Sequence, residues 1–165
     1  MDLPNRKQNR LQDFDYSQNG AYFVTICVKD RKELLSNVIV GTGVLDCPQI
    51  QLLKYGVVAE KYINQLNDFY NDISVDKYVI MPDHIHLLLT IINGQSRTPV
   101  PTNINNRNSA VAKFVSTFKR FCNKEYGENI WQPRYYDHII RNQEDYNETW
   151  EYIENNPIKW IETHK

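Results

Sequence analysis

Apolar and polar residues alternate with different periods along the chain, and each period predicts a different kind of element. Aromatic and β-branched residues with an alternating pattern predict strands at residues 21–28, 73–81, 84–92 and 135–141. Apolar residues recur every third or fourth position at residues 50–69, 109–126 and 142–155, which predicts helices. The predicted order is therefore strand, helix, strand, strand, helix, strand, helix.

The first six predicted elements have the β-α-β-β-α-β order of a ferredoxin-like domain, an α+β fold. We expect an antiparallel sheet with two helices on one face, which leaves the other face free for a ligand or a partner. The last helix is an addition to this plan. Its apolar stripe is formed by Tyr146, Trp150 and Ile153, and Pro157 is expected to end it.

The segments between these elements are polar. Gly41-Thr42-Gly43 suggests a phosphate-binding loop, but no Gly-Lys-Ser/Thr follows, so a turn or short hairpin is expected within residues 33–49. Residues 93–107 lack periodicity and are expected to form a mobile loop. Residues 1–19 form a polar arm, either a frayed terminus or a contact with a phosphate backbone. The domain is expected to span residues 20–160, followed by a tail at 161–165.

Composition excludes several classes of protein. The chain has 165 residues, a formal net charge of −1 and three cysteines without metal-type spacing, which favours one cytoplasmic domain with reduced thiols. No apolar run approaches the ~20 residues that span a bilayer, so no membrane partner is expected, and the polar start is not a signal peptide. A nucleic-acid partner would need a local basic surface.

Two histidines open the third predicted strand. Side chains alternate faces along a strand, so His84 and His86 point the same way, roughly 7 Å apart at the backbone, while Ile85 and Leu87 point into the core. Such a pair suits a metal ion, and equally suits the wet face of a half-buried strand. A metal site therefore requires a third ligand, and a reaction requires a nucleophile.

The final helix offers both groups on a flank away from its apolar stripe. Tyr152 supplies a phenol, and Asn156, four residues later, supplies a carboxamide on the same side. A phenol can act as a nucleophile in phosphoryl transfer, and a carboxamide oxygen can bind Mg²⁺ or Mn²⁺. The structural alternatives are an amphipathic tyrosine at a domain edge and an asparagine that caps the helix before Pro157.

Further polar residues are candidates for DNA contacts. His138 is either a hydrogen-bonded structural histidine or a group near the site, and Tyr135 and Tyr136 either stack on unpaired bases or belong to the core. The cationic candidates for phosphate contacts are Lys113, Arg120, Lys124, Arg134 and Arg141.

Three stretches together resemble a known family. Pro82-Asp83-His84-Ile85-His86 resembles the His-hydrophobic-His motif of the IS200-like, single-tyrosine transposases. WQPRYYDHIIRN at residues 131–142 and YIENNP at residues 152–157 resemble the branch called REP-associated tyrosine transposases. The resemblance covers about residues 20–160, and the combination is specific, whereas His-x-His alone is not.

This resemblance implies a mechanism and a set of site residues. His84, His86 and Asn156 would hold a divalent metal ion, Mg²⁺ or Mn²⁺, and Tyr152 would attack a phosphate of single-stranded or hairpin DNA. The products would be a 5′-phosphotyrosine and a free 3′-hydroxyl. Insertion-sequence members carry glutamine where this chain has asparagine, so the helix should lie closer to the sheet. Those members are dimers with a site shared between chains, whereas REP-associated relatives work as single chains, and both arrangements stay open here.

Other functions would use parts of the same set of residues. A histidine-triad nucleotide hydrolase needs a histidine where this chain has Leu88, which excludes it. A zinc hydrolase would take His138 or Asp83 as its third ligand and leave Tyr152 idle. A domesticated, non-catalytic nucleic-acid-binding protein is the stronger alternative, although the complete set of chemical residues counts against it.

Overall fold

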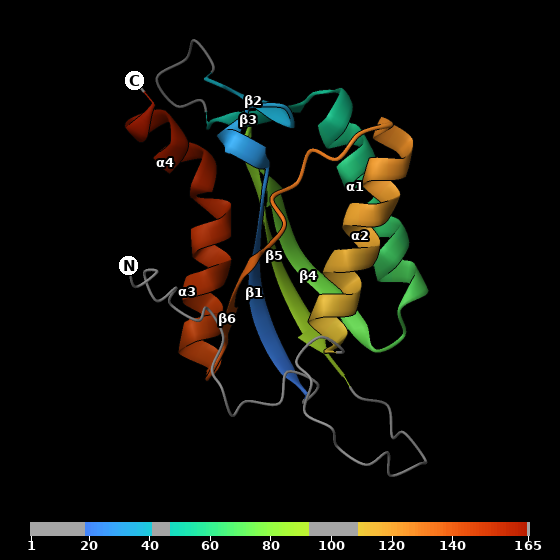
Figure 1. The fold of residues 1–165 in the computed structure, drawn as a ribbon. Helices are drawn as coiled ribbons and strands as arrows, with labels where there is room; N and C mark the ends of the chain where they lie inside the picture. The colour runs from blue at the N-terminus through green and yellow to red at the C-terminus, as the bar shows by residue number, and fades with distance from the viewer. Residues whose placement is uncertain (1–18, 41–46, 93–108, 165) are drawn as a thin grey trace, which may run out of the picture.

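The computed structural model describes residues 19–40, 47–92 and 109–164, and these form one sheet with helices on both faces (Figure 1). The sheet contains β1 (Gly20–Cys27), β4 (Ile73–Ile80), β5 (His84–Ile91) and β6 (Tyr136–Ile139). These strands are antiparallel and lie in the order β4-β5-β1-β6. This is the strand order of a ferredoxin-like sheet, so the predicted fold class is confirmed.

A separate hairpin of β2 (Ser36–Ile39) and β3 (Gln49–Leu52) lies beside the sheet. The hairpin expected within residues 33–49 is therefore confirmed. Gly41-Thr42-Gly43, the loop at 93–107 and all but the last residue of the arm at 1–19 lie outside the described residues. The predicted start of the first helix was wrong, because residues 49–52 pair with β2 and the helix begins only at Lys54.

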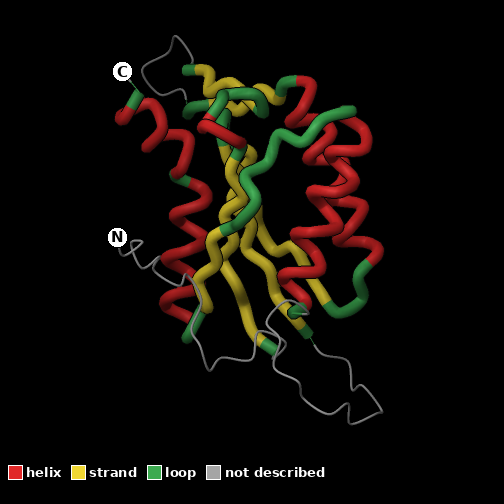
Figure 2. The backbone as a smooth tube through the Cα atoms, in the orientation of Figure 1, coloured by secondary structure: helices red, strands yellow, loops and turns green. Residues whose placement is uncertain are grey.

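Helices α1 (Lys54–Phe69) and α2 (Ala110–Tyr126) cover one face of the sheet (Figure 2). The Ser109 hydroxyl caps α2 by accepting a hydrogen bond from the Ala112 amide, and Gly127 ends it with φ 76°. The core between these helices and the sheet contains alternate β5 residues and apolar helix residues. Its β5 and helix members include Ile85, Leu87, Leu89, Ile63, Leu66, Phe114 and Phe118.

The buried face of α1 differs from the one that its large apolar residues predict. Val57 is exposed, whereas Gly56 and Ala59 are buried together with Ile63 and Leu66. A Cβ atom at position 56 would lie 2.0 Å from the Leu35 carbonyl oxygen, so only glycine allows this approach. The small residues therefore lie on the side of α1 that packs closest to the Leu35 backbone.

The opposite face of the sheet, expected to be free, carries α3 (Gln143–Glu154) and α4 (Asn156–Thr163) (Figure 1). Ile153 is buried there, but Trp150 is 37% exposed, which corrects its assignment to the core. Its ring stacks with Tyr146 and lies 4.3 Å from the Lys77 ammonium nitrogen. Lys77 also forms an ion pair with Glu154 at 3.3 Å, so the flank of α3 is tied to β4.

The connection between β4 and β5 is buried and held from two sides. The Leu35 amide donates to the Pro82 carbonyl at 3.0 Å, and the Val28 amide donates to the Asp83 carbonyl at 2.9 Å. Met81 closes the turn by donating its amide proton to the His84 carbonyl at 2.8 Å. This turn therefore presents the first histidine of β5 on a rigid backbone.

Candidate active site

The two histidines of β5 lie on the sheet face that α3 covers. Their Nε2 atoms are 3.0 Å apart and their ring centroids 4.5 Å apart. His86 is buried, and the His84 side chain is only slightly exposed. The predicted pair is thus formed, with one nitrogen of each ring directed at the other.

The remaining nitrogen of each ring has its own partner. The Nδ1 atom of His84 donates to the Asp83 carboxylate, which also pairs with Arg31 at 3.3 Å. The Nδ1 atom of His86 lies 2.8 Å from the Thr25 hydroxyl oxygen, which can accept a hydrogen bond from it. With Nδ1 protonated on both rings, each Nε2 atom keeps a lone pair for a ligand.

The electrostatics favour a neutral His86. Burial is the main cause that lowers the pKa of His86 to about 2, with smaller electrostatic contributions from its neighbours His84 and Arg31. Burial alone would raise the pKa of Asp83, but the hydrogen bond to His84 and the charges of His84 and Arg31 hold it below its ordinary value. The ionised Asp83 carboxylate thus accepts a hydrogen bond from the His84 ring, and the His86 ring stays uncharged at physiological pH, as a metal ligand requires.

The separation of the two Nε2 atoms fits a shared metal ion. Two nitrogens bound at about 2.1 Å and at right angles lie about 3.0 Å apart, and the observed distance is 3.0 Å. In the described ranges, no group of three or more His, Cys, Asp or Glu side chains could hold a metal ion. Asn156, 6% exposed, lines the same pocket as His84.

Tyr152 lies beside the histidines of its own chain. Its ring centroid is 5.4 Å from that of His86 and 5.7 Å from that of Phe23, both at steep angles. Tyr152 is 39% exposed and lines a surface pocket. One chain therefore brings the candidate nucleophile and the candidate ligands together.

The helix that carries these groups is broken, unlike the single helix expected from the sequence. Helix α3 ends at Glu154, Asn155 has φ −85° and ψ 0°, and α4 begins at Asn156. Pro157 stands in the first turn of α4, where its missing amide proton costs nothing. Proline therefore starts a second helix as well as following the first.

The pocket around Tyr152 has a volume of about 490 Å³ and is lined by cationic side chains that the sequence did not predict for the site. Arg31 reaches it from the 3₁₀ turn η1 (Lys29–Arg31) in a left-handed conformation, φ 54°. The Lys159 ammonium nitrogen lies 4.5 Å from the Tyr152 ring centroid. Lys159 follows Asn156 by three residues, a helical spacing that could have indicated it.

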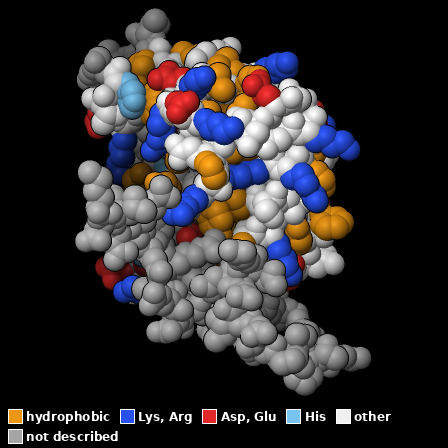
Figure 3. All heavy atoms as spheres, in the orientation of Figure 1, with side chains coloured by type: hydrophobic (Ala, Val, Ile, Leu, Met, Phe, Trp, Pro, Cys, Tyr) orange, Lys and Arg blue, Asp and Glu red, His pale blue; other side chains and the backbone are white. Residues whose placement is uncertain are grey.

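The predicted phosphate-binding cations lie elsewhere. Lys113, Arg120 and Lys124 are on the exposed side of α2, across the sheet from Tyr152, and Arg134 and Arg141 are exposed at the two ends of the β6 segment. None of the five lines the Tyr152 pocket. Lys and Arg side chains are spread over the face seen in Figure 3. These cations thus surround the fold without converging on the candidate site.

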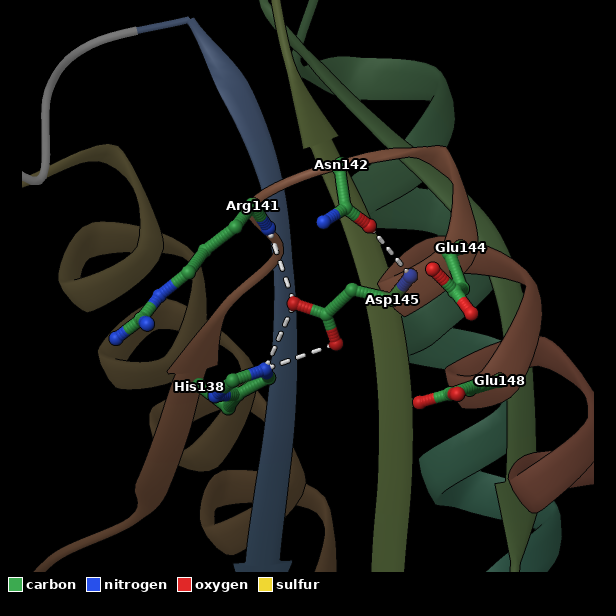
Figure 4. Close-up of a pocket in the computed structure, with 6 residues that line it drawn as sticks. All are labelled: His138, Arg141, Asn142, Glu144, Asp145 and Glu148. Carbon is green, nitrogen blue, oxygen red and sulfur yellow. Dashed lines mark hydrogen bonds and ion pairs between the residues drawn. The ribbon is translucent and has the colours of Figure 1, made fainter.

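His138 lines a different pocket, shown in Figure 4. Its Nε2 atom lies 3.0 Å from both carboxylate oxygens of Asp145, which also accepts a hydrogen bond from the Arg141 amide. The structure thus gives His138 a hydrogen-bonded role near the start of α3. Asp83 bonds to the Nδ1 side of His84, away from the paired Nε2 atoms, so neither residue is placed as the third ligand of a zinc hydrolase.

The two adjacent tyrosines at the start of the β6 segment differ in exposure. Tyr136 is 55% exposed, and Tyr135 packs partly buried against the core. None of the helices in the described part of the chain is long and apolar enough to cross a membrane.

Comparison with known proteins yields related sequences and a related structure. The family model described as "Transposase IS200 like" matches residues 16–156. An uncharacterised protein of Haemophilus influenzae is 30% identical, with 96% of this chain and 91% of that protein covered. A REP-associated tyrosine transposase of Escherichia coli is 26% identical, with 88% of this chain and 72% of that protein covered. A solved REP-associated tyrosine transposase bound to a REP hairpin has a TM-score of 0.61 at 22% identity, covering 91% of this chain and 74% of that one.

Proposed function

The chain belongs to the IS200-like transposase family, and from this premise we propose that it nicks and rejoins single-stranded DNA through Tyr152. We propose hairpin-containing repeat DNA as its substrate, because relatives are named REP-associated tyrosine transposases and a structure of the same fold is bound to a REP hairpin. The family is generally metal-dependent. We assign the metal, Mg²⁺ or Mn²⁺, to His84, His86 and Asn156.

One observation carries this proposal: the Tyr152 ring lies 5.4 Å from the His86 ring within one chain. An amphipathic tyrosine at a domain edge would have no reason to lie beside two histidines whose Nε2 atoms converge. The arrangement supports a nucleophile placed next to an ion that binds the same phosphate. It also supports a site built from one chain.

The reaction then follows from the chemistry of a phenol. The Tyr152 oxygen attacks the phosphorus atom, the bond from phosphorus to the 3′ oxygen breaks, and the phenolic proton ends on that 3′ oxygen. When bound, a divalent cation supplies stabilisation of the negative charge that develops on the phosphate. The phosphotyrosine keeps the energy of the phosphodiester bond, so another 3′-hydroxyl can reverse the step and no nucleotide cofactor is needed.

The surrounding residues hold the reacting groups. Asp83 and Thr25 fix the orientation of the two rings by bonding their Nδ1 atoms. Arg31 and Lys159 line the pocket, and we propose that they contact phosphates next to the cleaved bond. The five outlying cations are proposed contacts for the rest of the DNA: Lys113, Arg120, Lys124, Arg134 and Arg141.

The test is covalent trapping. A hairpin oligonucleotide with single-stranded flanks, labelled on the 3′ side, is incubated with Mn²⁺ and the protein, and products are separated under denaturing conditions. The native chain should form a labelled protein–DNA adduct and release a strand with a free 3′-hydroxyl. Tyr152→Phe should abolish both products, while Tyr136→Phe, which changes an exposed tyrosine outside the pocket, should leave them unchanged.

Two outcomes would contradict the proposal. Cleavage by Tyr152→Phe with a free 5′-phosphate would indicate a hydrolase that uses water. Tight hairpin binding by the native chain without any cleavage would indicate a non-catalytic binding protein.

A further inference from the structure

The end of α4 presents two stacked rings at the rim of the Tyr152 pocket. The rings of Trp160 and His164 have centroids 3.8 Å apart and planes only 9° apart. Both residues line the pocket together with Tyr152. Trp160 is half-buried, with its ring centroid 6.1 Å from that of His84, and His164 is exposed. The pair therefore runs from the candidate metal ligands outward to solvent.

The outer ring of this pair is held in place. The His164 Nδ1 atom lies 3.0 Å from the Trp160 carbonyl oxygen and 2.9 Å from the Thr163 hydroxyl. One face of the imidazole is covered by the indole, and the side chain as a whole is exposed. A flat ring fixed in this way loses little conformational entropy when another ring stacks on it.

The charges around the pair suit a nucleic-acid strand. Lys159 and Arg31 line the same pocket, and Lys159 lies over the Tyr152 ring. Phosphates follow the cations while bases stack on aromatic rings in sites that bind single strands. An aromatic pair that lines one pocket with two cations and a candidate nucleophile has the composition of such a site.

We propose that Trp160 and His164 form a stacking subsite for the unpaired base that flanks the cleaved phosphate. The base continues the stack on the outer face of His164, while Lys159 and Arg31 contact the adjoining phosphates. This inference rests on the proposed function, because it names a contact of the same substrate. It gives a role to the part of α4 that follows Asn156, which forms the wall of the pocket where we place the DNA.

The first test measures binding without chemistry. Oligonucleotides carrying 2-aminopurine at each position flanking the cleavage site are titrated with protein in EDTA. We expect quenching of the probe at one position, and Trp160→Ala should remove it and weaken binding about tenfold, the effect of one lost base–aromatic stack. Trp160→Phe should restore most of both signals. His164→Ala should weaken binding less, since the uncovered indole can take the base directly.

The matched control is Trp150→Ala, which removes an exposed tryptophan that lies on α3 outside this pocket. It should leave quenching and affinity unchanged. Unchanged quenching and affinity in Trp160→Ala, with a normal circular dichroism spectrum, would overturn the inference. The covalent-adduct assay separates the two hypotheses. If Trp160→Ala forms the adduct as well as the native chain does, only the stacking subsite is wrong. If the native chain forms no adduct, the proposed function is wrong.

Discussion

The Tyr146 hydroxyl fastens α3 to the sheet, and Tyr146→Phe removes that bond alone. Tyr146 donates to Asp76 at 3.0 Å, and the same carboxylate accepts from Ser74 at 2.9 Å and from Thr90. Asp76 stands at a β-bulge between Val75 and Lys77, which interrupts the β4–β5 register. Bulges redirect side chains, and here the redirected carboxylate meets the helix that carries Tyr152.

The stability that Tyr146→Phe should lose follows from the kind of hydrogen bond that it removes. A hydrogen bond to a charged acceptor contributes about 1.5–3 kcal/mol. Because Asp76 keeps two other donors and the contact is partly exposed, the lower value applies, about 1.5 kcal/mol. For a domain of this size, that loss lowers the melting temperature by about 3–6 °C.

The effect should depend on pH. Burial, then the hydrogen bond and charge of Asp76, raises the pKa of Tyr146 to about 12. A phenol whose pKa is higher in the folded state than its ordinary value of about 10 stabilises the fold fully below pH 10 and loses that contribution as the pH rises towards 12. The stability difference between the native chain and Tyr146→Phe should therefore shrink in this alkaline range.

Urea denaturation at pH 8, with melting curves at pH 8 and above pH 10, measures both effects. Tyr136→Phe is the control, because Tyr136 is largely exposed and changes the same atoms. A loss in Tyr146→Phe of less than about 0.5 kcal/mol, the range of ordinary surface substitutions, would refute the reasoning. The packing of Ile153 and the contacts of Lys77 with Glu154 and Trp150 would then hold α3 without the Tyr146 hydrogen bond.

Two further predictions, each with a control substitution, test the site and the fold. Asp83→Asn should weaken Mn²⁺ binding about 10–100-fold in calorimetry, the usual cost of removing a carboxylate that orients a ligating histidine. Arg31→Met breaks only the outer ion pair of Asp83, so an equal loss there would contradict this role. Gly56→Ala should lower the free energy of unfolding by more than about 2 kcal/mol, because its Cβ meets the Leu35 carbonyl oxygen. Gly127→Ala, with φ 76° and open space around it, should cost only about 1 kcal/mol in the same urea titration, and equal losses would disprove the clash.

The order of elements could be predicted because local patterns decide it. The strands around the Met81-Pro82-Asp83 turn and the capped helix after Ser109 each carry their own signals, and the structure confirms them. Helix α4 was missed because Pro157 is an equally good signal for a stop and for a first turn. A rule about one residue cannot distinguish the end of one helix from the start of another.

The composition of the pocket depends on long-range contacts, which no local pattern contains. Arg31 follows the first strand and Lys159 stands near the end of the chain, yet both meet at Tyr152. Trp150 is apolar, which predicts a core position, but its ring instead contacts the Lys77 cation and the Tyr146 ring. The residues proposed as metal ligands carry a local signal, because His84 and His86 share one strand and Asn156 follows Tyr152 by four residues.

The break at Asn155 has a consequence for how such sites diverge. Tyr152 belongs to α3, which is anchored to β4 through Tyr146 and Lys77, whereas Asn156 opens the separate helix α4. We therefore expect a longer amide side chain at position 156, as in Asn156→Gln, to displace α4 while Tyr152 keeps its place against the sheet.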